Sequence, residues 1–315
     1  LHPAHHHHAR DDASEQVHLA LGAAGEMRVV FATTDAAVAS EVYYWVHSEP
    51  DQLRTARGTP HVYSQLLYLN DYLAHPPMGA PTISEADILA LQNTLAWAID
   101  PTTGERTAAW AAPTKVEWWS FGREYNPKAV YNSPFLHTVS LSPLEAGTKY
   151  GYRVAGSERV FSFTMPPVSD AVDAAAFPMT LGVIADVGQT AVSQLNFGVL
   201  AALEPTAVLL AGDLAYADGW TPRWDSYGRM AEPLSSAVPV MTAGGNHEIG
   251  SGESWVSYNA RYPMPAAASG SASNQWWSAD IGPAHVVSLC SYAATAAGSP
   301  QRAWHARRLA VVERC

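Results

Sequence analysis

Three short motifs in the second half of the chain contain residue types that bind hard metal ions. Asp186 follows one apolar run, Asp213 and Tyr216 follow a second, and Asn246 and His247 follow a third. Carboxylate, phenolate and amide oxygens are ligands for hard cations, and ferric iron is among those that favour a phenolate. One carboxylate can also bridge two ions about 3.5–4 Å apart, a spacing that clamps a phosphoryl group and activates water.

The apolar runs that precede these motifs have the length of buried β-strands. They cover residues 179–185, 207–211 and 238–242, and a fourth strand is predicted at 284–289. Between the first two runs, aliphatic residues recur at helical spacing, namely Val192, Leu195, Val199 and Leu203. A strand–helix–strand order implies a parallel sheet with helices on its faces. Such sheets gather ligands outside the carboxyl ends of their strands, so we expect the three motifs to meet in one crevice.

Each motif has a simple structural explanation when it is taken alone. An aspartate after a strand is usually a helix cap or a turn residue, and Tyr216 alone would be core packing. The conjunction is different, because all three motifs stand at strand ends, 27 and 33 residues apart. Gly212, Gly244 and Gly245 would let the backbone turn tightly beneath the ions. The motifs together predict part of a two-metal phosphoesterase site.

Composition narrows the classes of partner. The net charge is −11, with 18 Lys and Arg residues and no basic cluster longer than a pair. An acidic surface repels nucleic-acid backbones and anionic lipid, so we expect neither as a partner. No apolar run approaches the length of a transmembrane helix. A small phosphorylated substrate would need a local positive centre, which again points to metal.

The first half of the chain has the sequence pattern of an all-β domain. Short β-branched and aromatic runs, separated by Gly, Asp and Ser, occur at 18–21, 27–32, 41–46, 135–141, 149–154 and 159–164. Six such strands indicate an immunoglobulin-like or fibronectin-like sandwich. Residues 84–99 interrupt the pattern with apolar residues at helical spacing.

These patterns divide the chain into successive regions. The His-rich residues 1–15 are expected to be a flexible tail, and 16–165 to be the sandwich, with a helical insertion at about 70–115. The stretch 166–177 has the composition of a linker. Residues 178–315 would then be an α/β unit, which we expect to be truncated because further strands should follow.

The motifs resemble those of the plant-type purple acid phosphatases. The segments 186–188, 212–216 and 245–248 are similar to the first three of five signature blocks of that family. Arg223–Arg229, Gln16–His18 and Val62–Leu66 are also similar, the last to the larger, phytase-like members. The resemblance implies a fibronectin-like sandwich followed by a metallophosphoesterase domain.

By position, the resemblance gives each residue of the site a role. Asp186 would bind Fe(III), Asp213 would bridge both ions, and Tyr216 would be the phenolate ligand. Asn246 would bind the divalent ion (Zn, Mn or Fe), and with His247 it would contact the substrate phosphate. An activated water would then attack phosphorus in line. Glu248, which follows His247, would only orient its neighbours.

The family pattern is incomplete in this sequence. In the family, three histidines from two later blocks complete the coordination, and neither block is present. We expect His285 to be a structural residue of a strand and His305 to lie in a helix. The sequence therefore predicts an incomplete or impaired form of an acid phosphatase.

Several functional alternatives remain open at this level. The chain could be a non-catalytic protein that binds a partner or carbohydrate and has a vestigial metal site, or it could be a metallophosphodiesterase. Tyr216 favours the phosphatase over the diesterase. The resemblance implies a small phosphorylated substrate, and the phytase-like members suggest phytate. A homodimer is left open. The resemblance also implies a secreted or vacuolar protein, although no signal segment is visible.

Overall fold

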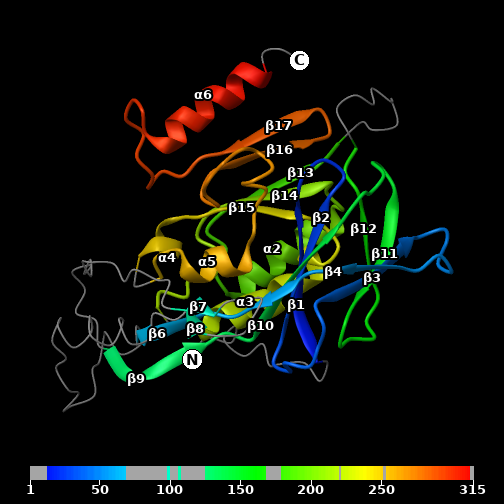
Figure 1. The fold of residues 1–315 in the computed structure, drawn as a ribbon, viewed down its shortest axis with the longest axis horizontal. Helices are drawn as coiled ribbons and strands as arrows, with labels where there is room; N and C mark the ends of the chain where they lie inside the picture. The colour runs from blue at the N-terminus through cyan, green and yellow to red at the C-terminus, as the bar shows by residue number, and fades with distance from the viewer. Residues whose placement is uncertain are drawn as a thin grey trace.

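The computed structural model describes residues 13–68, 98–99, 106–107, 125–167, 179–219, 221–250 and 253–312. The described part of the chain forms a β-sandwich followed by a parallel α/β unit, and the two pack side by side (Figure 1). This order confirms the predicted fold class. No helix in the described ranges is both long and apolar enough to cross a membrane.

The sandwich consists of two four-stranded antiparallel sheets. The first sheet has the order β1-β2-β10-β5, with bounds Ser14–Leu21, Met27–Thr33, Phe135–Leu141 and Thr59–His61. The second has the order β12-β11-β3-β4, with bounds Phe161–Thr164, Lys149–Val154, Glu41–Val46 and Arg54–Arg57. All six strands predicted from the sequence are present. Buried aromatic residues pair between neighbouring strands of the second sheet, as do Tyr150 of β11 and Phe163 of β12, whose ring centroids are 5.6 Å apart.

The start of the sandwich lies earlier than predicted. β1 begins at Ser14, so the last two residues of the expected tail are part of a strand. The Ser14 hydroxyl donates to the Ala155 carbonyl at 2.6 Å, and Glu15 pairs with Arg229. These partners are far away in the sequence, which is why the local composition did not reveal the boundary.

The expected insertion and linker are mostly outside the described residues. Two short pairs of strands are described near the insertion. They are β6 (Ser64–Tyr68) with β9 (Tyr125–Asn132), and β7 (Ala98–Ile99) with β8 (Arg106–Thr107). Ile99 therefore belongs to a strand, and its assignment to the predicted helix was wrong. The rest of that helix, and most of the 166–177 linker, lie outside the described residues.

The α/β unit is built on a three-stranded parallel sheet. Its order is β13-β14-β15, with bounds Leu181–Ile184, Ala207–Ala211 and Val240–Ala243. The helices α2 (Ala191–Ala202) and α3 (Pro222–Ser235) connect these strands. The short helices α4 (Asn246–Ile249) and α5 (Val256–Arg261) follow, and α6 (Pro300–Val312) comes last among the described elements. The predicted parallel arrangement of the first three strands is confirmed.

The fourth predicted strand does not join this sheet. β17 (Ala284–Ser288) pairs antiparallel with β16 (Trp277–Ile281) in a separate two-stranded sheet. Gly282, with φ +56°, forms the tight turn between them. The sequence analysis did not predict β16. Without that antiparallel partner, the parallel sheet was the only sheet to which the strand at 284–289 could be assigned.

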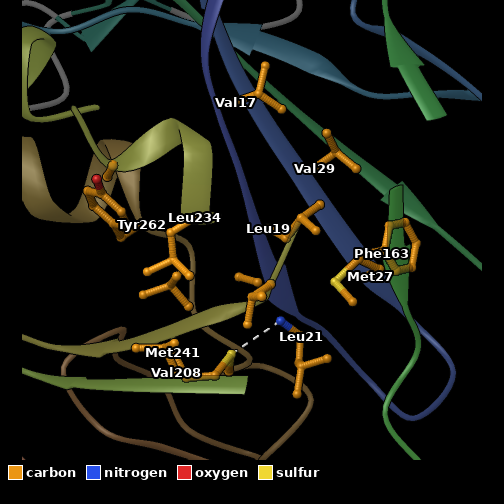
Figure 2. Packing of buried hydrophobic residues seen from close by; sticks show 14 of the residues in the cluster. Val17, Leu19, Leu21, Met27, Val29, Phe163, Val208, Leu234, Met241 and Tyr262 are labelled. Atoms are coloured by element: carbon orange, nitrogen blue, oxygen red, sulfur yellow. Dashed lines mark hydrogen bonds between the residues drawn. The ribbon is translucent and has the colours of Figure 1, made fainter. Parts of the chain in front are cut away.

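One large hydrophobic cluster extends from the sandwich into the α/β unit. All eight residues of β1 are buried, because the strand is covered on both faces. Figure 2 shows Leu19 and Leu21 between Met27 and Phe163 of the sandwich and Met241 of β15. One continuous cluster therefore positions the α/β sheet against the sandwich, and burial of this apolar area is the main stabilising contribution at the interface.

Candidate metal centre

The ends of β13 and β14 place two aspartates side by side. Beyond the strands, the backbone amides of Asp186 and Val187 donate to the carbonyls of Gly212 and Asp213, at 3.1 and 3.0 Å. Asp186 and Asp213 both have φ near +54°, a left-handed conformation that is unusual for residues other than glycine. Strained backbone of this kind clusters at functional sites, because the surrounding structure must hold it in place.

The loop after β15 closes against the loop after β14. A Cβ on Gly245 would lie 2.1 Å from Asp213 Oδ1, so no other residue fits there without displacing the carboxylate. A Cβ on Gly212, whose φ is +93°, would lie 3.1 Å from the Gly245 Cα. A side chain would therefore be crowded at both positions, at Gly212 by the Gly245 backbone and at Gly245 by the Asp213 carboxylate.

Tyr216 links the first two motifs through its hydroxyl. Its phenol donates to Asp186 Oδ1 at 3.1 Å, and its ring lies 4.1 Å from the His247 ring between centroids. Burial, followed by the hydrogen bond to Asp186 and the charge of Asp213, raises the pKa of Tyr216. A bound cation would reverse that shift, because it favours the phenolate.

The third motif supplies groups from the start of α4. The His247 backbone amide donates to Asp213 Oδ1 at 3.1 Å, which ties this motif to the second. Asp213 is buried, whereas Asp186 and Asn246 are exposed to solvent. The five predicted residues thus stand at three neighbouring strand ends, with the links Asp186–Tyr216, Tyr216–His247 and Asp213–His247 between them.

Glu248 holds the second and third loops together. Its buried carboxylate accepts hydrogen bonds from the backbone amides of Asp213, Leu214 and Gly245, at 2.9, 2.8 and 2.8 Å. Burial raises the pKa of Glu248, and these three amides oppose the shift by favouring the charged form. These contacts tie Glu248 to the loops of Asp213 and Gly245, and its role in orienting its neighbours stays a prediction.

Sequence reasoning missed Asp218. Its carboxylate lies 2.5 Å from His247 Nδ1, and this hydrogen bond is the largest cause of the raised pKa of His247. The contact leaves Nε2 as the ring nitrogen available to a ligand. The one feature of the sequence that could have indicated this residue is its position two residues after Tyr216 in the same loop. Aspartates are common in loops, so this position alone did not single it out.

Sequence reasoning also missed Glu253. The side chain is fully buried and accepts from the Gly219 amide and from Trp224 Nε1, both at 3.0 Å. It therefore anchors the loop that contains Asp218. Burial raises the pKa of Glu253 to about 7.

Glu253 should make stability depend on pH. Its pKa is higher in the folded chain than in the unfolded chain, so the folded state binds the extra proton between about pH 4.5 and 7. We expect the free energy of unfolding to fall by about 3 kcal/mol as the pH rises through this window. Urea unfolding from pH 4.5 to 8 measures this, and Glu253→Gln should remove that part of the dependence. An unchanged slope in the variant would contradict the role of Glu253.

The donor set matches the oxygen side of a hard-metal site. Asp186, Asp213, Tyr216 and Asn246 supply carboxylate, phenol and amide oxygens, which suit iron and other hard cations. No group of three or more His, Cys, Asp or Glu suited to a metal occurs within the described ranges.

His285 pairs with Asp280 at 2.5 Å on the β16–β17 hairpin, and His305 lies in α6, so both have the structural placements predicted for them.

Comparison with protein families gives two matches in the order of the two units. Residues 14–165 match the model for the purple acid phosphatase N-terminal domain. Residues 179–296 match the model for calcineurin-like phosphoesterases. The boundary between the matches falls at the expected linker.

Curated relatives point to the same family. The chain is 40 % identical over 214 residues to purple acid phosphatase 21 and 39 % identical over 189 residues to purple acid phosphatase 22, both of Arabidopsis thaliana. These alignments cover 63 % and 58 % of this chain, and 47 % and 42 % of the relatives. A purple acid phosphatase of Glycine max is 31 % identical, with 78 % of this chain and 56 % of the relative covered. The chain thus spans about half the length of the curated relatives it matches.

A solved structure supports the fold. The purple acid phosphatase from yellow lupin seeds superposes with a TM-score of 0.61 at 18 % identity, covering 96 % of this chain and 49 % of the lupin chain. At this identity the likeness concerns the fold alone. It agrees with the arrangement of a sandwich followed by an α/β unit.

Proposed function

Because this chain belongs to the purple acid phosphatase family, we propose that it is a metal-dependent phosphatase that acts on phosphate monoesters. The observation that best supports the proposal is the Tyr216 hydroxyl 3.1 Å from Asp186 Oδ1, next to the buried Asp213. A phenol beside two carboxylates at strand ends is a donor set for ferric iron. It also favours the monoesterase over the diesterase alternative.

The proposed ligands divide between two ions, one Fe(III) and one divalent ion (Zn, Mn or Fe). Asp186 and Tyr216 would hold the first and Asn246 the second, and Asp213, whose Oδ1 accepts from the His247 amide at 3.1 Å, would be shared by both. Such ions, when bound, stabilise charge on the phosphoryl oxygens and activate water. The phosphate is expected to meet Asn246 and the Nε2 side of His247.

The same residues set a limit on activity. The oxygen ligands assigned here come without a histidine, and loss of ligands lowers metal affinity steeply. We therefore propose slow hydrolysis by the chain as it stands. We propose phytate as the substrate, because Val62–Leu66 is similar to the phytase-like members of the family. A secreted or vacuolar location is also a proposal, and it rests on the family resemblance alone.

Hydrolysis of two synthetic esters tests this proposal. We expect the iron- and zinc-loaded chain to hydrolyse p-nitrophenyl phosphate faster than bis-p-nitrophenyl phosphate, and Asp213→Ala to reduce the first rate to background. Equal rates for the wild type and Asp213→Ala would mean that the site is not catalytic, which would favour the non-catalytic binding protein. A preference for the diester would favour the phosphodiesterase.

Asp218→Asn tests the positioning of His247. The Asp218 carboxylate raises the pKa of His247 and so favours the cationic ring, in which Nδ1–H donates to Asp218 and Nε2–H can donate to phosphate. A neutral amide removes this support, and when its oxygen accepts from Nδ1–H the neutral ring presents Nε2 to phosphate as an acceptor. We expect inorganic phosphate to bind the metal-loaded chain about 10- to 100-fold more weakly, the range typical of carboxylates that orient functional histidines. Isothermal titration measures this, with Asp280→Asn, which affects the remote His285 pair, as the matched control. Equal losses in both variants would show a general structural effect.

A further inference from the structure

Gln189 is a buried amide next to the candidate metal centre. It follows Gly188 in the loop that begins at Asp186, and its side chain is 7 % exposed. Burying a carboxamide is unfavourable unless its donors and its acceptor are paired. The residue lies just outside the three motifs of the site, so its contacts must explain why a polar side chain is buried there.

The Gln189 carboxamide connects three segments of the α/β unit. Its Nε2 donates to the Ala215 carbonyl at 2.8 Å and to the Arg223 carbonyl at 2.9 Å, which uses both of its hydrogen atoms. Its Oε1 accepts from the Ser226 hydroxyl. One side chain therefore ties the loop after β13 to the loop after β14 and to the first turn of α3.

These contacts act on Tyr216 through the backbone. Ala215 directly precedes Tyr216, whose φ of +48° is a left-handed conformation that the surrounding structure must hold in place. The Arg223 guanidinium donates to the Tyr216 carbonyl at 3.1 Å, and Gln189 binds the Arg223 backbone. The peptide units before and after the Tyr216 Cα are therefore held by Gln189, the first directly and the second through Arg223.

The loop that contains Gln189 also contacts the Tyr216 ring. A Cβ on Gly188 would lie 3.3 Å from Tyr216 Cδ2, so the ring lies against this glycine. A shift between the loops after β13 and β14 would change two contacts of the site. These are the 3.1 Å hydrogen bond from the Tyr216 hydroxyl to Asp186 and the 4.1 Å separation of the Tyr216 and His247 rings.

We propose that Gln189 is a positioning residue of the metal centre, whose carboxamide holds the Tyr216 phenol beside Asp186 and His247. The inference rests on the proposed function, because it concerns a residue that we assign to the iron. It goes beyond that function in naming a residue that acts through two backbone carbonyls. Residues that orient metal ligands in this way typically change metal affinity about 10- to 100-fold when they are replaced.

Nuclear magnetic resonance of the metal-free chain tests the positioning directly. The ring current of Tyr216 acts on the His247 ring protons, because the two ring centroids are 4.1 Å apart. His247→Gln identifies the His247 signals, and Tyr216→Ala shows where they lie without the tyrosine ring. Gln189→Met keeps the length of the side chain and removes both donors. We expect it to move the His247 signals from their wild-type positions toward those in Tyr216→Ala.

The matched control is Gln301→Met. Gln301 in α6 is also a buried amide with two backbone contacts, because its Oε1 accepts from the Cys290 amide at 2.7 Å and its Nε2 donates to the Cys290 carbonyl at 3.0 Å. Its replacement should leave the His247 signals at their wild-type positions. Unchanged His247 signals in Gln189→Met, or equal shifts in both variants, would overturn the proposal.

A milder variant keeps the test decisive if Gln189→Met does not fold. Ser226→Ala removes the hydroxyl that orients Gln189 Oε1 and leaves the carboxamide in place. We expect a smaller shift of the His247 signals in the same direction. Wild-type signals in a folded Ser226→Ala would then count against the proposal.

Iron binding measures the consequence for the metal centre. Gln189→Met should bind Fe(III) about 10- to 100-fold more weakly than the wild type and weaken the absorption band between phenolate and iron, whereas Gln301→Met should bind it like the wild type. Wild-type iron affinity in Gln189→Met would overturn the role of Gln189 in the metal centre. A wild type that shows no band would contradict the proposed function alone, because the metal-free spectra decide the position of Tyr216 by themselves.

Discussion

Replacing Asp213 with alanine is expected to abolish tight binding of both metal ions, with affinities at least ~100-fold weaker for each. The carboxylate lies between the loops that hold Asp186 and Asn246, and its Oδ1 is fixed by the His247 amide at 3.1 Å. A single group shared by two ions cannot be removed without weakening both. Metal content after equilibrium dialysis against iron and zinc measures the result.

A matched variant separates bridging from general damage to the loop. Asp186→Ala removes an exposed carboxylate that we assign to one ion only, so it should leave the second ion close to its wild-type affinity. If Asp213→Ala instead retains one full equivalent of either metal, the bridging assignment is wrong. Circular dichroism of both variants checks that the fold is intact.

Replacing Arg261 with methionine is expected to destabilise the protein by about 3–5 kcal/mol, the cost of breaking a buried ion pair. The buried guanidinium donates to Asp225 Oδ1, the Tyr63 hydroxyl and Gln16 Oε1, each at 2.8 Å, and to the Tyr131 hydroxyl at 2.5 Å. Removing the cation leaves the partly buried Asp225 carboxylate with the neutral donors Tyr131 and Gln16 but without the guanidinium. Arg261 lies in α5, and three of its four acceptors, Gln16, Tyr63 and Tyr131, precede the α/β unit, so the change also loosens the contact between the two units.

Urea unfolding followed by fluorescence measures this loss. Arg57→Met is the matched control, because Arg57 pairs with Glu41 at 2.8 Å on the exposed surface, and exposed pairs contribute little. We expect Arg57→Met to unfold like the wild type. A loss in Arg261→Met no larger than in the control would show that the network does not stabilise the interface. A stable double variant with Asp225→Leu would confirm that the cost lies in the carboxylate left without the guanidinium.

The sequence was sufficient for the parts of the fold that depend on local pattern. The runs before Asp186, Asp213 and Asn246 formed parallel strands as predicted, because strand-length apolar runs separated by a helical pattern specify this arrangement. The six sandwich strands were equally legible. The convergence of the motifs then follows from topology, since the carboxyl ends of parallel strands share one edge.

Features that depend on contacts between residues far apart in the sequence could not be predicted from the sequence. Asp218 and Glu253 act through single contacts with His247 and Gly219, and no spacing rule marks such residues. The start of β1 at Ser14 depends on Ala155, far along the chain. The aliphatic residues of α2 recur with a helical period, but periodicity shows only that an apolar face exists and not which element covers it.

The central claim is that Tyr216 is a ligand of ferric iron, and a visible absorption spectrum tests it most directly. The chain loaded with Fe(III) and zinc should show a charge-transfer band between the phenolate and iron, and Tyr216→Phe should lose the band while still folding. Tyr43→Phe, which removes a hydroxyl bound to Glu41 on the sandwich, should keep it. A folded, iron-loaded wild type without the band, or a band that persists in Tyr216→Phe, would contradict the assignment of the metal centre.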